Sequence, residues 1–100
     1  MLILAVESSC DETAVALVRD GRELVTDQVF SQADLHAVYG GVVPEIASRS
    51  HTEVISYLAE RALEKGGVSR TEIDAVAVTY APGLIGALLV GVNFAKAAAL

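Results

Sequence analysis

The stretch Ala5-Val6-Glu7-Ser8-Ser9-Cys10-Asp11-Glu12-Thr13-Ala14-Val15-Ala16-Leu17 decides the fold. An apolar run over residues 2–6 stops at a polar stretch, and a second apolar run over residues 14–18 follows directly. Both runs are short and rich in β-branched residues, and the interruption is too short to hold a helix. The pattern therefore predicts two antiparallel strands joined by a tight polar turn.

The polar turn gathers hydroxyl, carboxylate and thiol groups, from Glu7, Ser8, Ser9, Cys10, Asp11, Glu12 and Thr13. Backbone N–H groups and hydroxyls in such a turn can hold a phosphate, and its carboxylates can hold a hydrated cation. We therefore expect a ligand-binding wall here. Composition alone leaves a solvated hairpin tip as the alternative.

A third strand and a long loop follow. Asp20-Gly21 is typical of a hairpin turn, and residues 23–30 alternate in the manner of a strand near a sheet edge. Residues 31–43 show little periodicity and include Gly40-Gly41, which predicts a long loop. Long loops inside compact domains often carry function.

A helix is expected over residues 44–65. Pro44 suits the first helical position, and Gly66-Gly67 suits a left-handed end. Residues 69–72 form a capping-box pattern for one further helical turn.

The apolar run over residues 75–79 predicts a buried strand. Because a right-handed crossover leads into it, this strand should lie parallel to a neighbour. The loop Ala81-Pro82-Gly83 then falls at its carboxyl end, where open α/β sheets bind ligands. We expect this loop and the polar turn to lie together.

The last expected helix runs from Leu84 to the end of the sequence and is apolar nearly all round. Small residues form one stripe, and bulkier ones form another face. A helix without a polar face is either buried on both sides or covered by a partner. Both the remainder of a longer protein and a second subunit could supply that cover.

Composition limits the classes of protein to which this chain can belong. The chain has 100 residues, 53% hydrophobic and 20% charged, which predicts one ordered α/β domain or part of a larger one. The net charge of −6 and scattered basic residues disfavour nucleic-acid binding by this segment alone. The single cysteine and the absence of a signal-peptide pattern indicate the cytoplasm. The uncharged run over residues 75–95 is interrupted by Pro82-Gly83, so we expect no membrane span.

The two histidines are poor candidates for metal ligands. They stand fifteen residues apart, too far for an H-x-x-x-H pair, so we assign no metal ligand in this chain. His51 lies on the apolar face of the predicted helix and is expected in the core. His36, in the long loop, is the better candidate for function. Cys10 is expected to be a packing or turn residue rather than a nucleophile.

Three segments resemble the TsaD family, the tRNA threonylcarbamoyladenosine transferases once called glycoproteases. They are Val6-Glu7-Ser8-Ser9-Cys10-Asp11-Glu12-Thr13, His36-Ala37-Val38-Tyr39-Gly40-Gly41-Val42-Val43-Pro44-Glu45-Ile46-Ala47-Ser48-Arg49 and Ala81-Pro82-Gly83-Leu84-Ile85-Gly86-Ala87-Leu88-Leu89-Val90-Gly91. The resemblance implies an α/β fold, the first half-lobe of an actin-like ATPase (ribonuclease H-like) domain. Three antiparallel strands would be followed by a helix, a parallel strand and a helix. Residues 1–100 would form a single, incomplete N-terminal subdomain.

The resemblance also implies a reaction and a site. The family transfers a threonylcarbamoyl group from its ATP-derived adenylate to N6 of adenosine 37 in tRNAs that read codons beginning with A. On this basis we predict catalytic roles for Asp11 and Glu12, which would act by electrostatics. Substrate-binding roles are predicted for Ser8, Ser9, Thr13, His36, Pro82 and Gly83. The family's divalent metal, iron or zinc, would have its ligands outside this chain, so the segment alone should be inactive.

Partners follow from the same resemblance. A paralogous subunit would dock on the helices over residues 44–65 and 84–100. ATPase and kinase-like accessory subunits would complete the modification complex, and tRNA would bind mainly through regions outside this chain.

Two other functions remain open. One is a non-catalytic partner module with the same lobe, although the segment from His36 to Arg49 is typical of the catalytic branch. The other is a metalloendopeptidase, although no H-E-x-x-H pattern is present.

Overall fold

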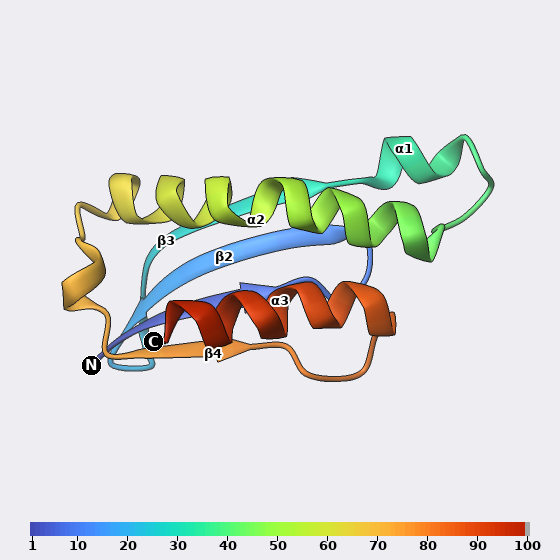
Figure 1. Ribbon diagram of the computed structural model, residues 1–100. Coiled ribbons are helices and arrows are strands. Elements are labelled where there is room, and N and C mark those ends of the chain that lie inside the picture. Colours follow the sequence, from blue (N-terminus) through green and yellow to red (C-terminus); the bar gives the residue numbers. More distant parts are fainter. Residues whose placement is uncertain (100) are drawn as a thin grey trace.

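The computed structural model describes residues 1–99, which form one four-stranded sheet with helices on one of its faces (Figure 1). In chain order the elements are β1 (Leu2–Glu7), β2 (Glu12–Arg19), β3 (Glu23–Ser31), α1 (Ala33–Ala37), α2 (Pro44–Gly66), the 3-10 turn η1 (Arg70–Glu72), β4 (Ala75–Val78) and α3 (Ile85–Ala98). Helix α2 lies along β2 and β3, and α3 lies along β1 and β4. The last residue of the predicted final helix, residue 100, lies outside the described residues.

The sheet order β3-β2-β1-β4 makes β1 a central strand. Its partner β2 is antiparallel, with Val6 opposite Val15, and its partner β4 is parallel, with Val6 opposite Val78. The predicted antiparallel start and the predicted parallel strand are therefore both confirmed. The parallel pairing brings the carboxyl ends of β1 and β4 to the same edge of the sheet.

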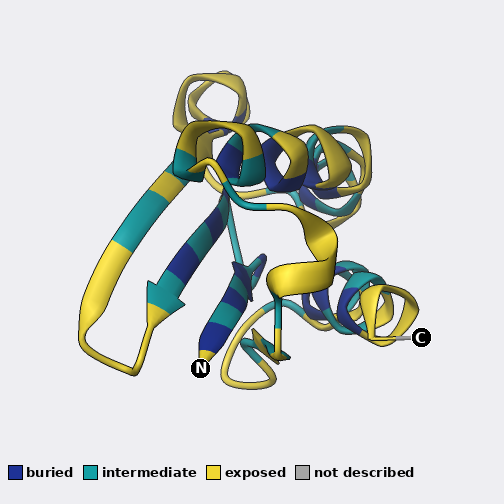
Figure 2. Ribbon diagram, turned by 90° about the vertical axis from the view of Figure 1, so that its left-hand side faces the viewer, coloured by how far each residue is buried: buried dark blue, intermediate teal, exposed yellow. Residues whose placement is uncertain are grey.

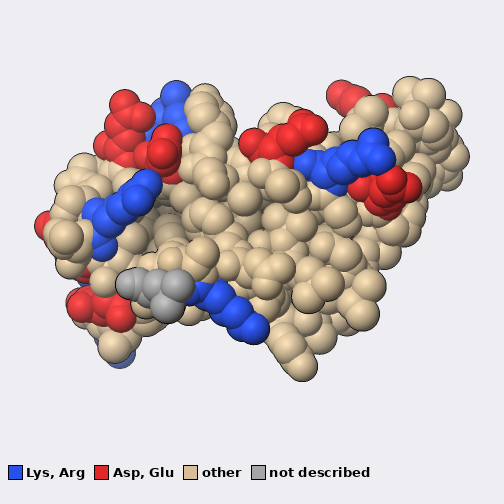
Figure 3. All heavy atoms as spheres, in the orientation of Figure 1, with Lys and Arg blue, Asp and Glu red and all other residues tan. Residues whose placement is uncertain are grey.

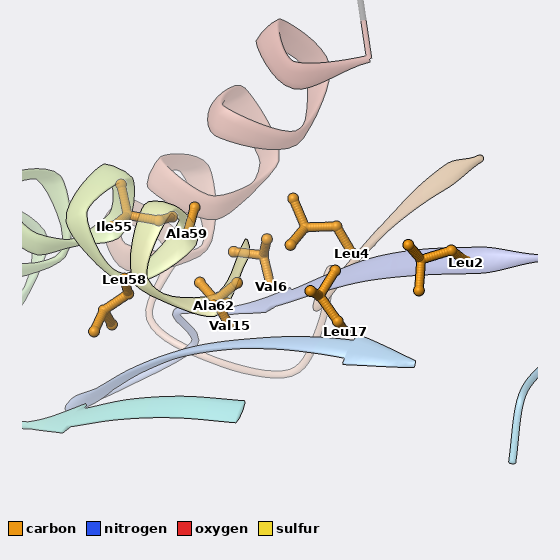
Figure 4. Packing of buried hydrophobic residues seen from close by; sticks show 9 residues of the cluster. All are labelled: Leu2, Leu4, Val6, Val15, Leu17, Ile55, Leu58, Ala59 and Ala62. Carbon is orange, nitrogen blue, oxygen red and sulfur yellow. The ribbon is translucent and has the colours of Figure 1, made fainter. Parts of the chain in front are cut away.

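The core lies between the sheet and α2. Residues of β1 and β2 alternate between buried and half-buried, because successive side chains point to opposite faces of a strand (Figure 2). The buried side chains meet the inner face of α2 (Figure 4) in a cluster of Leu2, Leu4, Val6, Val15, Leu17, Ile55, Leu58, Ala59 and Ala62.

The opposite face of the sheet has no helix over it among residues 1–99. Small side chains line an open hollow of about 340 Å³ there, including Ala5, Ala14, Ala16 and Ala77. Packed sheets carry helices or a second sheet on such faces, so this face is apolar surface that residues 1–99 leave uncovered.

The loop prediction for residues 31–43 was only partly right. The structure contains the short helix α1, which begins after Gln32 and ends before the glycine pair. The predicted turn over residues 69–72 is confirmed as η1, with the Ser69 N–H donating to Glu72 Oε2 over 2.7 Å. Among the helices of residues 1–99, none is long and apolar enough to cross a membrane.

Candidate functional site

The polar turn between β1 and β2, together with the strand residues that flank it (residues 7–13), is called the bend from here on. It lies against the loop that joins β4 to α3, as the sequence predicted. Leu84 N–H donates to the Ser9 carbonyl over 2.7 Å. A Cβ on Gly83 would lie 2.6 Å from the same oxygen, so only glycine lets the two segments approach this closely. The Ala81–Pro82 peptide bond in this loop is cis.

Ser8 holds the bend to α3. Its side chain is fully buried, and its hydroxyl donates to the Ala87 carbonyl over 2.7 Å and accepts from Gly91 N–H over 3.1 Å. Ser8 was predicted to contact substrate, but the structure directs its hydroxyl into the interior. The physical reason is that Ser8 continues the alternation of β1 and so faces the helices.

Thr13 and His51 hold the bend to α2. Both are fully buried, with 2.6 Å between Thr13 Oγ1 and His51 Nδ1. The other ring nitrogen, His51 Nε2, lies 2.8 Å from the Cys10 carbonyl oxygen. The core position predicted for His51 is confirmed. Thr13, predicted to bind substrate, has its hydroxyl inside the protein instead.

Glu7 joins the carboxyl ends of the parallel strands β1 and β4. Its carboxylate accepts hydrogen bonds from Ser9 N–H and, over 2.5 Å, from the Thr79 hydroxyl. Partial burial raises the pKa of Glu7, but the bonds from Ser9 and Thr79 outweigh it and hold the pKa below the ordinary value of 4.5. Glu7 is therefore a structural carboxylate of the bend, a role that sequence reasoning missed.

Asp11 and Glu12 are the carboxylates of this segment that remain available. Glu12 is exposed and Asp11 is half-buried. Neither side chain forms a hydrogen bond or ion pair with another described residue, whereas the Asp11 backbone carbonyl accepts from Gln32 N–H over 2.8 Å. The backbone around them is thus fixed and their charges are free to act on a ligand.

His36, the predicted loop candidate, is buried with both ring nitrogens engaged. Val43 N–H donates to its Nδ1 over 3.1 Å, so Nε2 carries the proton and donates to Gln32 Oε1 over 2.7 Å. Gln32 in turn donates to the Ala47 carbonyl of α2 over 3.4 Å. His36 therefore anchors the loop through its hydrogen bonds, and its side chain is not open to substrate.

No three histidine, cysteine, aspartate or glutamate side chains gather into a metal-binding group within residues 1–99. Each histidine has both ring nitrogens occupied by protein partners, so neither is free to ligate. The residues described here do not fit an iron or zinc centre, and no step of the chemistry below is routed through one.

The sheet order, the parallel crossover and the bend beside the β4–α3 loop define the class of protein: part of an actin-like ATPase domain. A solved structure described as YeaZ from Pseudomonas aeruginosa has this fold, with a TM-score of 0.73 and 21% identity, covering 98% of this chain and 38% of that one.

The chain belongs to the TsaD family. The family model described as tRNA N6-adenosine threonylcarbamoyltransferase matches residues 23–100. Relatives of that description are 63% identical over 99 residues in Geotalea uraniireducens and 59% identical over 97 residues in Caldicellulosiruptor saccharolyticus. These matches cover 99% and 97% of this chain, which spans 29% of either relative's length.

Proposed function

We propose that this chain is the N-terminal part of an enzyme that transfers a threonylcarbamoyl group from its adenylate to N6 of adenosine 37 in tRNA. Its substrates would be the tRNAs that read codons beginning with A. The observation that carries the proposal is the bend, which is hydrogen-bonded to α2, α3 and the β4–α3 loop, while the side chains of Asp11 and Glu12 have no hydrogen-bond or ion-pair partner within residues 1–99.

The bend would contribute to the reaction by electrostatics. Transfer of the acyl group to an adenosine amine requires the amine to lose a proton as the new bond forms, and a fixed carboxylate stabilises the positive charge that develops there. Asp11 and Glu12 supply two such charges. The Ser9 side chain and the exposed loop at Pro82 and Gly83 would form the neighbouring wall, which would contact the adenylate.

The cation that the resemblance implies, iron or zinc, would be held by residues outside this chain. This chain would then be inactive by itself. The uncovered alanine-rich face of the sheet supports the view that residues 1–100 are one subdomain of a longer protein. We assign the whole protein to the cytoplasm, in keeping with the single cysteine of this chain and with the proposed tRNA substrate.

The outer face of α3 is proposed as a docking surface for a paralogous subunit, together with α2. Ile85 and Leu89 expose 81% and 52% of their surface, and a broad area over α3 carries few charges (Figure 3). An apolar helix face of this kind suits a helix pair with a similar subunit. ATPase and kinase-like subunits and the tRNA would bind mainly to other parts of the protein.

The test is a double variant of the full-length protein, Asp11→Ala with Glu12→Ala, assayed with its partner subunits for transfer of labelled threonylcarbamoyl to tRNA. We expect the turnover number to fall by roughly 100-fold or more, since each carboxylate acts on the reacting atoms. The matched control, Glu23→Ala with Asp27→Ala, removes the same charge from exposed positions on β3 and should leave transfer unchanged. Wild-type turnover in the bend variant would refute the assigned role.

The same assay, run beside a peptide-cleavage assay on the full-length protein, separates the two rival functions. A full-length wild-type protein that transfers nothing but is required by a second, active subunit would be a non-catalytic partner. A protein that cleaves peptides without modifying tRNA would be an endopeptidase. Either result would remove the proposed function.

A further inference from the structure

We propose that His51 is a positioning residue, which fixes the bend from beneath by bonding to the residues on either side of Asp11 and Glu12. The inference rests on the proposed function for its catalytic consequence, because the bend must belong to the transfer site for its position to affect turnover. The geometric part stands on the hydrogen bonds alone.

The two hydrogen bonds use both nitrogens of the ring. The Cys10 carbonyl can only accept a hydrogen bond, so Nε2 of His51 carries the proton that it donates over 2.8 Å. Nδ1 of His51 and the Thr13 hydroxyl share the second hydrogen bond, over 2.6 Å. One imidazole ring thus satisfies a carbonyl and a hydroxyl at the same time.

The location of these partners gives His51 its role. Cys10 immediately precedes Asp11, and Thr13 immediately follows Glu12, so the histidine holds both flanks of the carboxylate pair. Gln32 N–H holds the Asp11 carbonyl between them over 2.8 Å. These hydrogen bonds hold the backbone on both sides of Asp11 and Glu12. A change in either His51 hydrogen bond would therefore move the two carboxylates.

A histidine kept only to fill space would not need this arrangement. A leucine of similar size could fill the volume beneath the bend, but it would leave the Cys10 carbonyl and the buried Thr13 hydroxyl without partners. Ser8 makes the corresponding attachment from α3, so the bend is held from both helices. His51 is the attachment that bonds to the residues flanking the two carboxylates.

The experiment compares His51→Gln, His51→Asn and His51→Leu in the full-length protein with its partner subunits. A glutamine amide reaches the position of Nε2 and can still donate to the Cys10 carbonyl, whereas asparagine reaches only the position of Nδ1. We expect the turnover number to fall by roughly 10- to 100-fold for Asn and Leu, with KM for tRNA changed by less than about 3-fold. Glutamine should recover most of the lost turnover.

Two controls separate positioning from folding. Ile55→Val removes a buried methyl group one turn further along α2, in the core cluster, and should lower thermal stability without lowering turnover. Hydrogen exchange of the peptide covering residues 8–13 should be faster in the Asn and Leu variants and near wild type in the Gln variant. If the leucine variant does not fold, the Gln and Asn pair decides the question.

The outcomes are distinguishable. Turnover that follows melting temperature across all variants, Ile55→Val included, would overturn the positioning role, as would unchanged exchange in residues 8–13. If the variants show faster exchange at the bend but the wild-type protein transfers nothing, the result supports the role of His51 in fixing the bend and refutes the proposed function. Faster exchange with wild-type turnover would overturn the catalytic consequence alone.

Discussion

Substituting Gly83 by alanine tests the contact between the bend and the β4–α3 loop. The new Cβ would lie 2.7 Å from Ser9 Cβ, whereas ordinary contacts begin at 3.4 Å, so the two segments must separate by about 0.7 Å. The Leu84 N–H to Ser9 carbonyl bond would lengthen from 2.7 Å to nearly the limit of a hydrogen bond.

The energetic cost follows from these two changes. Crowding of a packed contact costs about 1–3 kcal/mol and the weakened hydrogen bond about 1 kcal/mol. Lower entropy of the unfolded chain offsets about 0.5 kcal/mol. We therefore expect a loss of about 1.5–3.5 kcal/mol in the free energy of unfolding, and a roughly 10-fold or larger fall in transfer rate because the bend is displaced.

The assay is urea unfolding of the full-length protein, followed by circular dichroism, beside the tRNA-transfer rate. Gly86→Ala is the control for folding, because its Cβ would come close only to the Ser48 hydroxyl, at 2.7 Å, and that hydroxyl can rotate away at the cost of its bond to the Pro44 carbonyl. Helix α3 tolerates alanine at that position. Equal urea midpoints for the two variants would show that the approach of Gly83 to Ser9 is not tight, and the reasoning would fail.

Three further predictions concern the bend and the proposed docking face. Ser8→Ala should cost about 1–3 kcal/mol, because the two buried hydrogen bonds of its hydroxyl, to the Ala87 carbonyl and from the Gly91 N–H, are lost; an unchanged urea midpoint would contradict this. Because the pKa of Glu7 is lowered in the folded protein, the stability it contributes is present above the unfolded value of 4.5 and is lost as pH falls through the folded value. Glu7→Gln should therefore lose less stability than wild type on acidification below about pH 4.5, and equal losses would argue against a structural carboxylate. Ile85→Glu with Leu89→Glu should weaken binding of the paralogous subunit by roughly 100-fold in sedimentation experiments, and unchanged binding would exclude α3 from the interface.

The sheet and its main helices could be predicted because their signals are local. The polar interruption after Val6, the proline at the start of α2 and the glycine pair at its end each set a boundary through the immediate neighbours. The parallel direction of β4 followed from the handedness of crossovers, which is a rule of connection rather than of composition. Helix α1 was missed because five residues are too few to show a period.

The roles of the polar side chains could not be predicted in the same way. Ser8, Thr13 and His36 were expected to face a ligand because polar residues in a turn usually face water. The hydrogen-bond partners of the buried Ser8 and Thr13 hydroxyls lie 79 and 38 residues further along the chain, so no local sequence pattern indicates them. The one available signal was the alternation of β1, which continues through Ser8 and points it at the helices.

The attachment of Ser8 to Gly91 also fixes an order of events during synthesis. The bend leaves the ribosome before its acceptor and donor partners in α3, which follow 79 and 83 residues later. Hairpin β1–β2 can pair early, whereas the bend cannot reach its final shape until α3 has been made. A nascent chain halted before residue 87 should therefore carry a paired hairpin whose tip is still open to proteases.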